Sequence, residues 1–167
     1  MRQAPEKYAP LLNDFINLLE KEFTGNIVSA VLYGSVARGT ERKDSDIDVC
    51  LVFKHLPESR HKRTLLIFPV IKAVRERESY QLLYRDGYLP EISPVLYTSE
   101  EIENTKPVFL DMVDEGIVLF DDGTWNRKIS DLRHRMEELG THKVILPDGG
   151  YYWVIKPGLR LGEVVSL

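Results

Sequence analysis

The sequence predicts a mixed α/β (α+β) fold, with helices packed on a small mixed β-sheet and a short β tail at the C-terminus. Three observations carry this prediction: several segments repeat apolar residues at helical spacing, two apolar runs are rich in β-branched residues, and 43% of the 167 residues are hydrophobic. We expect a single domain over residues 1–167, with a core over about residues 5–124 and a C-terminal helix and β-hairpin tail over about 125–167.

The N-terminal part supplies one helix and two central strands. Apolar residues recur at helical spacing from Glu6 to Phe23, which predicts an amphipathic helix. The runs Ile27–Tyr33 and Ile47–Phe53 are nearly continuous in their apolar character, so we expect two strands that are buried on both faces. Between them, Gly34–Gly39 predicts a tight turn that leads into a short helix.

The remaining segments alternate between helical and strand patterns. Glu58 to about Tyr84 is helical in pattern, and Pro69 is expected to kink or split this helix. Ile92–Tyr97 predicts a third strand, in which Pro94 suits a sheet edge or a bulge. Further helices are expected to open at Thr98–Glu101 and to span Pro107–Glu115 and Trp125–Leu139, and further strands to span Ile117–Phe120, Lys143–Leu146, Tyr151–Ile155 and Glu163–Leu167.

Composition narrows the class of protein. The formal net charge of −4 argues against extended nucleic-acid binding, because such binding depends on an excess of lysine and arginine. No apolar run approaches the roughly 20 residues of a membrane-spanning helix, so we expect no membrane association. The single cysteine, Cys50, lies in an apolar run and cannot form an internal disulfide. We therefore expect a buried thiol and a cytoplasmic location.

Gly34 and Ser35 end the first predicted strand and begin the short helix. Glycine lets the backbone approach a ligand closely, and a helix N-terminus offers N–H donors and a positive dipole. A serine hydroxyl at this place can add one more hydrogen bond. The pair suits a phosphate group, and a turn glycine followed by a helix-capping serine is the structural alternative.

Asp46 and Asp48 lie two residues apart at the start of the second predicted strand, so both carboxylates are expected on the same side of the sheet. Two carboxylates this close repel each other unless a cation joins them. Mg²⁺ suits them, because it prefers oxygen ligands and usually binds one or two carboxylates together with substrate phosphates. A solvated acidic loop is the alternative for such a pair taken alone.

The two motifs together favour a nucleotide site. We expect Gly34 and Ser35 to face the same crevice as Asp46 and Asp48, because ligands of open α/β sheets bind where strands end. A nucleoside triphosphate fits both motifs, with a metal ion between its phosphates and the protein.

Gly34-Ser35, ten intervening residues and Asp46-Ile47-Asp48 resemble the signature of the DNA polymerase β-type nucleotidyltransferase superfamily. More narrowly, the segments GSVARG and SDIDV are similar to those of the minimal nucleotidyltransferases of archaea and bacteria. The resemblance covers about residues 28–53. It implies a nucleotidyltransferase-like fold and a metal-dependent enzyme that transfers a nucleoside monophosphate to a hydroxyl acceptor, with ATP as the default donor among the nucleoside triphosphates.

The resemblance also implies roles for individual residues. Asp46, Asp48 and a third carboxylate on a later strand would be the catalytic metal ligands and would hold two Mg²⁺ ions, with Mn²⁺ as a substitute. Glu91 is the candidate for the third carboxylate, and Asp86 is the alternative. The residues implied to bind the nucleotide are Gly34, Ser35, Arg38, Lys43 and Ser45.

Two functional hypotheses follow from this resemblance. Minimal nucleotidyltransferases pair with HEPN-type proteins in toxin–antitoxin-like systems, where the acceptor can be a hydroxyl group of the partner. The first hypothesis is therefore an active nucleotidyltransferase that modifies a partner protein. The second is an antitoxin-like binding module that neutralises a HEPN-type partner by contact, with little turnover. The presence of all four motif residues, Gly34, Ser35, Asp46 and Asp48, favours the enzyme.

Overall fold

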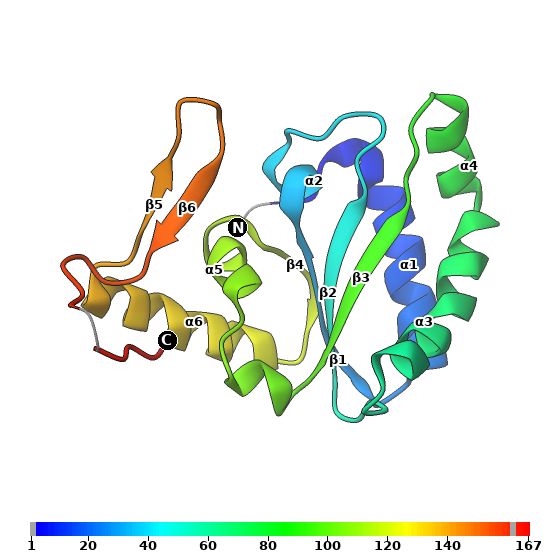
Figure 1. Ribbon diagram of the computed structural model, residues 1–167. Helices are drawn as coiled ribbons and strands as arrows, with labels where there is room; N and C mark the ends of the chain where they lie inside the picture. The colour runs from blue at the N-terminus through cyan, green and yellow to red at the C-terminus, as the bar shows by residue number, and fades with distance from the viewer. Residues whose placement is uncertain (1–2, 161–162) are drawn as a thin grey trace.

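The computed structural model describes residues 3–160 and 163–167 of the chain. A four-stranded mixed sheet lies between two groups of helices, and a separate two-stranded hairpin stands beside them (Figure 1). The helices are η1 Glu6–Tyr8, α1 Ala9–Glu22, α2 Gly34–Arg38, α3 Arg60–Arg75, α4 Glu78–Arg85, η2 Glu101–Glu103, α5 Pro107–Glu115 and α6 Thr124–Leu139. The strands are β1 Ile27–Tyr33, β2 Ile47–Phe53, β3 Ile92–Thr98, β4 Ile117–Asp121, β5 His142–Ile145 and β6 Tyr151–Val154. The predicted mixed fold with a C-terminal hairpin is confirmed.

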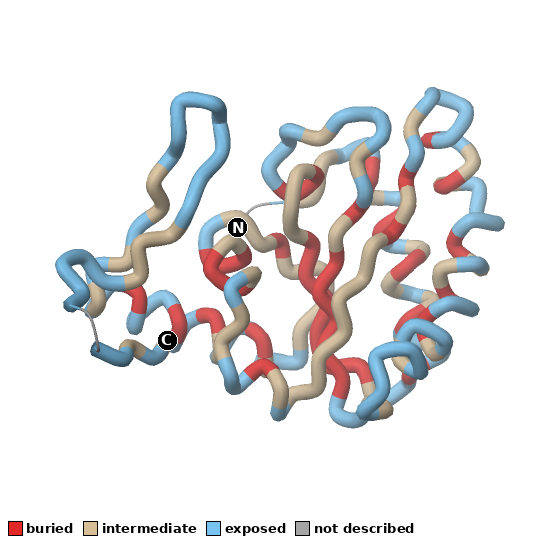
Figure 2. Tube along the Cα trace, in the orientation of Figure 1, coloured by how far each residue is buried: buried red, intermediate tan, exposed pale blue. Residues whose placement is uncertain are grey.

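The sheet has the strand order β3-β2-β1-β4. The central strands β1 and β2 run antiparallel, β4 pairs antiparallel with β1, and β3 pairs parallel with β2. Figure 2 shows that the two central strands are the most continuously buried part of the chain. Their near-continuous apolar sequences match this position, because both faces of the sheet are covered by helices.

The two faces of the sheet bury separate apolar clusters. Helices α1, α3 and α4 cover one face, where Phe15, Leu32, Val49 and other side chains pack together. Helices α5 and α6 cover the other face, where Phe109 and Trp125 stack edge to face with ring centroids 5.2 Å apart. Cys50 lies in this second cluster as a free, buried thiol, as predicted.

Two expectations about element boundaries were wrong. The predicted helix from Glu58 to about Tyr84 divides at Glu76–Arg77, between α3 and α4, whereas Pro69 lies inside α3. Arg77 has an extended backbone and begins the second helix as its N-cap, so the chain turns there. The segment Glu163–Leu167 was expected to form a strand, but it is neither helix nor strand.

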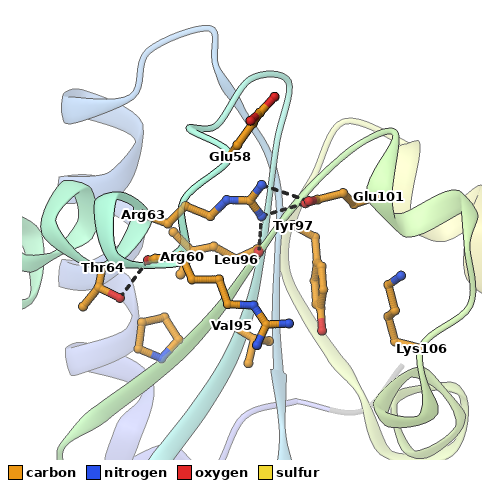
Figure 3. Close-up of a pocket in the computed structure, with 10 residues that line it drawn as sticks. Glu58, Arg60, Arg63, Thr64, Val95, Leu96, Tyr97, Glu101 and Lys106 are labelled. Atoms are coloured by element: carbon orange, nitrogen blue, oxygen red, sulfur yellow. Dashed lines mark hydrogen bonds and ion pairs between the residues drawn. The ribbon is translucent and has the colours of Figure 1, made fainter.

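The outer edge of β3 is blocked against further strand pairing. Pro94 has no N–H to donate, Arg63 Nη1 donates to the Leu96 carbonyl over 3.2 Å, and Glu101 Oε2 accepts the Thr98 N–H over 2.9 Å. Arg63 also pairs with Glu101 through both carboxylate oxygens, over 2.7 and 2.9 Å (Figure 3). A cavity of about 390 Å³ lies along this edge. Pro94 therefore occupies the edge position that its chemistry predicts.

The hairpin β5–β6 follows α6 and packs beside α5. Its two strands are antiparallel, with Lys143 opposite Trp153 in the register. The indole N–H of Trp153 donates to Asp111 of α5 over 2.9 Å, which ties the hairpin to the main body of the fold. Among the helices of residues 3–160 and 163–167, none combines the length and apolar character that crossing a membrane requires.

Candidate active site

The end of β1 and the start of β2 lie side by side because the two strands are antiparallel. Tyr33 is the register partner of Asp48, so the Gly34–Ser35 turn begins beside the carboxylate pair. Gly34 has a backbone φ of +74°, in the left-handed region that favours glycine. A Cβ atom at Gly34 would lie 3.2 Å from Asp48 Cγ and closer still to one carboxylate oxygen. The structure therefore brings the glycine turn and Asp48 into direct contact.

Ser35 lies in the first turn of α2 and does not cap it. The N-cap position belongs to Tyr33, and no side chain hydrogen-bonds to this helix end. Gly39, with a φ of +73°, ends the helix in the left-handed conformation. Ser35 is therefore not a capping serine, and this half-buried residue follows the turn glycine directly.

Asp46 is exposed and Asp48 is half-buried at the start of β2. Burial, followed by the negative charge of Asp46, raises the pKa of the Asp48 carboxyl above its ordinary value, and Arg38 and the hydroxyl of Ser93 oppose this rise. The ionised form of Asp48 is therefore disfavoured in the free protein. A divalent cation with a preference for oxygen ligands fits this donor set.

The candidate third carboxylate, Glu91, lies just before β3, and its backbone carbonyl accepts the Ile47 N–H over 2.8 Å. Its side chain meets α3 and α4: Tyr80 Oη donates to Glu91 Oε1 over 2.7 Å, and Arg75 forms an ion pair with the other oxygen. Ser93, the parallel register partner of Asp48, occupies the neighbouring place on β3. Within the described part of the chain, no three acidic, histidine or cysteine side chains gather into a metal-binding group.

The alternative, Asp86, is exposed at the end of α4. Its backbone carbonyl accepts a hydrogen bond from Lys43 Nζ over 2.8 Å. The ammonium of Lys43 also lies 5.2 Å from the centroid of the Tyr88 ring. In this structure Lys43 is thus directed toward the connection between α4 and β3.

Arg38 and Ser45, two of the residues expected to bind the nucleotide, form different hydrogen bonds in the structure. Arg38 Nη1 donates to Glu115 Oε2 over 2.8 Å, and its positive charge opposes the rise in the pKa of Asp48. The hydroxyl of Ser45 accepts the N–H of Arg42 over 2.9 Å and so closes a turn of the loop before β2. Arg38 lies within electrostatic reach of the carboxylate pair, whereas Ser45 shapes the loop that presents the pair.

Ser93 and Glu115 are site residues that sequence reasoning missed. Ser93 could be found only once the register of β2 against β3 was known, because nothing in its neighbourhood resembles a motif. Glu115 is one of many acidic residues on predicted helices, and it lies 77 positions after Arg38 in the chain. Both residues are recognised only from contacts between segments that lie far apart in the chain.

Comparisons with known proteins show which proteins the chain resembles. A family model described as "Nucleotidyltransferase domain" matches residues 12–116. A protein of Methanocaldococcus jannaschii named as a "putative protein adenylyltransferase" is 24% identical over 126 residues, which cover 74% of this chain and 79% of its own length. A second protein of that organism with the same description is 34% identical over 71 residues, which cover 40% of this chain and 71% of its own.

The chain is also similar to solved structures. One is a crystal structure of a toxin–antitoxin with AMP-PNP. It has a TM-score of 0.47 and 18% sequence identity, and the match covers 77% of this chain and 92% of that chain.

Proposed function

The chain belongs to the nucleotidyltransferase domain family, and we propose that it is a metal-dependent enzyme that transfers AMP from ATP to a hydroxyl group of a partner protein. The observation that carries the proposal is the contact between the Gly34 turn and Asp48. This contact supports the proposal, because nucleotidyl transfer would need a backbone that binds phosphate beside a carboxylate pair that binds metal. The names of the two Methanocaldococcus relatives support a protein as the acceptor.

Asp46 and Asp48 are the residues that would hold Mg²⁺. When bound, this ion would neutralise negative charge on the triphosphate. The chemistry of these carboxylates fits the ion, because Asp46 disfavours the charged form of Asp48, and a bound cation would oppose this effect as Arg38 and Ser93 do. Glu91 remains the candidate for a third ligand. In the structure its carboxylate is held by Tyr80 and Arg75, so it would have to change partners.

The other residues of the site would bind and orient the nucleotide. The backbone of Gly34 and the hydroxyl of Ser35 suit the β- and γ-phosphates, because no side chain caps this turn. Arg38 can add charge-assisted hydrogen bonds to phosphate oxygens, since a guanidinium has five N–H donors and Glu115 occupies one nitrogen. Together these groups would fix the α-phosphate for in-line attack by the acceptor hydroxyl.

A transfer assay with two labels tests the proposal. The protein is incubated with Mg²⁺ and proteins of its source cell, with ATP labelled on either the α- or the γ-phosphate. We expect protein-bound label from α-labelled ATP only, and its loss in the Asp46→Asn variant. Label from the γ-position that appears only when the protein is added, and not with the extract alone, would indicate a kinase and would contradict the proposal.

A second candidate function is a binding module that acts by contact with a partner, such as a HEPN-type protein, and turns over little nucleotide. One observation favours it: the described residues do not place a third carboxylate with Asp46 and Asp48. The two functions differ in what the Asp46→Asn variant retains. A contact module would still neutralise its partner after this substitution, whereas an enzyme that acts by modification would not.

A further inference from the structure

Glu115, at the end of α5, connects the active site to the C-terminal hairpin. Its Oε2 atom accepts a hydrogen bond from Arg38 of α2 over 2.8 Å, and its Oε1 atom lies 2.7 Å from Lys143 Nζ of β5. The side chain of Glu115 is only 12% exposed, so a carboxylate that is largely shielded from water is shared between two cations. The matched nucleotidyltransferase domain ends at residue 116, and Lys143 lies beyond it.

Lys143 is itself held tightly in place. Its side chain is 17% exposed, and its ammonium lies 4.0 Å from the centroid of the Tyr151 ring and 3.7 Å from Asp111 Oδ1. Asp111 in turn accepts the indole N–H of Trp153 over 2.9 Å. Aromatic rings and a second carboxylate thus fix the ammonium on the hairpin, and its place depends on how the hairpin docks.

The division of the Glu115 carboxylate limits how it can bind Arg38. Arginine pairs most tightly with a carboxylate when two of its N–H groups meet both oxygens. Here Lys143 occupies Oε1, and Arg38 reaches Oε2 through Nη1 alone. The guanidinium is therefore anchored at one nitrogen, and no residue within 3–160 or 163–167 accepts a hydrogen bond from its other donors. The same side chain carries the charge that acts on Asp48.

We propose that Lys143 and Glu115 are positioning residues that hold Arg38 in a monodentate pair, so that its free donors can bind the triphosphate. The proposal deepens the proposed function and rests on it, because it takes the ligand of Arg38 to be the phosphates of ATP. Without Lys143, Glu115 turns both oxygens to Arg38 and competes with the nucleotide. The hairpin thus sets the affinity of the site for ATP, although it lies outside the matched domain.

The first test needs no nucleotide. Proton–nitrogen NMR spectra of the arginine side chains are recorded for the wild type and for Lys143→Gln, with the Arg38 signal assigned from its absence in Arg38→Lys. In the wild-type background, we expect Lys143→Gln to shift the Arg38 guanidinium signal and to leave the other signals unchanged. In the Glu115→Gln background, Lys143→Gln should leave the Arg38 signal unchanged as well. The matched control, Lys156→Gln, removes a lysine of the same tail that pairs with Glu163 and should leave Arg38 unaffected. An unchanged Arg38 signal in Lys143→Gln would overturn the proposal.

The second test measures the consequence for ATP by calorimetry in the presence of Mg²⁺. Lys143→Gln should weaken ATP binding by roughly three- to tenfold, and the loss should vanish in the Arg38→Ala and Glu115→Gln backgrounds. Equal losses in all backgrounds would mean that Lys143 acts only on general stability, and this would refute the positioning role. If the wild type binds no ATP, the proposed function fails, and the NMR result still decides whether Lys143 positions Arg38.

Discussion

Gly34 and Asp48 show how closely the backbone and a carboxylate approach each other in this site. The left-handed conformation of Gly34 turns the chain sharply out of β1, and the missing Cβ leaves space for the Asp48 carboxylate. Any other residue at this position would have both an unfavourable φ and a steric overlap. The Gly-Ser and Asp-x-Asp motifs are therefore one structural unit, joined by contact as well as by spacing.

A comparison of Gly34→Ala with Gly39→Ala separates the cost of the unfavourable φ from the cost of the steric overlap with Asp48. Both glycines have nearly the same φ, +74° and +73°, but a Cβ at Gly39 would meet no atom within 4 Å. Urea unfolding should show that Gly39→Ala lowers the free energy of unfolding by about 1 kcal/mol, and that Gly34→Ala lowers it by about 2–4 kcal/mol. Equal losses in the two variants would mean that Asp48 does not pack against this turn.

Asp48→Asn should stabilise the metal-free protein. Burial and the charge of Asp46 raise the pKa of Asp48, so the folded state binds this proton more readily than the unfolded state does. The stabilisation from this proton is complete below the unfolded pKa and is lost as the pH rises through the folded pKa. At pH 7 the neutral amide should therefore raise the unfolding midpoint by about 1–3 °C, an increase that disappears in acid.

Thermal unfolding in chelator, at pH 7 and at pH 3, measures this effect. Asp44→Asn is the matched control, because Asp44 is exposed and, in the part of the chain that the structure describes, forms an ion pair with the neighbouring Arg42 alone. It should leave the midpoint unchanged within about 1 °C. A lower midpoint for Asp48→Asn at pH 7 would show that the ionised carboxylate is not a source of strain in the free site.

At the residue scale, the sequence allowed the short motifs of the candidate site to be predicted. It did not allow contacts between residues far apart in the chain to be predicted. The glycine turn and the carboxylate pair are recognisable because each is a short motif at the end of an apolar run. The contacts of Arg38 and Lys143 with Glu115 span 77 and 28 positions of the chain. No periodicity or spacing rule reaches across such distances, so the partners of Arg38 emerged only from the structure.

The edge strand β3 illustrates the same limits at the scale of elements. Pro94 predicts an edge position from its own chemistry, but the closure of that edge depends on Arg63 from α3 and Glu101 from η2. The two side chains pair through both oxygens, and Arg63 holds the pKa of Glu101 below its ordinary value of 4.5. The ion pair between Arg63 and Glu101, and their hydrogen bonds to the backbone of β3, together attach α3 to the outer edge of this strand.

Glu101→Gln should weaken this attachment in a pH-dependent way. Because the folded pKa of Glu101 is lowered, its stabilisation is present above the ordinary pKa and is lost as the pH falls through the folded value. We expect the variant to lose roughly 0.5–1 kcal/mol of unfolding free energy at pH 7, and to match the wild type in strong acid. Urea unfolding across this pH range measures the loss.

The control for this substitution is Glu103→Gln, in the same short helix. Glu103 is exposed, and its side chain forms no ion pair with any residue of the described ranges. Its replacement should not change the stability at either pH. If Glu101→Gln were equally neutral at pH 7, the pair with Arg63 would not contribute to closing the edge of β3.

Element boundaries followed the sequence wherever local signals and tertiary packing agreed. β1, β2 and α5 begin and end at the residues that the apolar runs and the flanking glycines predict. The division of the long helix at Glu76–Arg77 was missed, because Pro69 is the stronger local signal. Packing against α1 and the sheet overrides that signal and keeps Pro69 within one helix.

At the scale of the whole molecule, the family match ends at residue 116, although β4 and α6 complete the sheet and its core after that point. Residues 12–116 match the family, whereas α6 and the hairpin follow that region and pack against α5. The order of strands in the sheet could not be predicted from one sequence, since periodicity reports which faces are buried and not which strands are neighbours. The hairpin itself was predictable from its turn residues, but its link to Arg38 was not.

The measurement that tests the central claim most directly is calorimetric titration of ATP with and without Mg²⁺. It compares the wild type with the Asp46→Asn/Asp48→Asn double variant and requires no knowledge of the acceptor. We predict binding that depends on Mg²⁺ in the wild type and is lost in the double variant, while the variant keeps its fold by circular dichroism. Binding of equal strength in both proteins would contradict the claim that the carboxylate pair and the Gly34 turn form one metal-dependent nucleotide site.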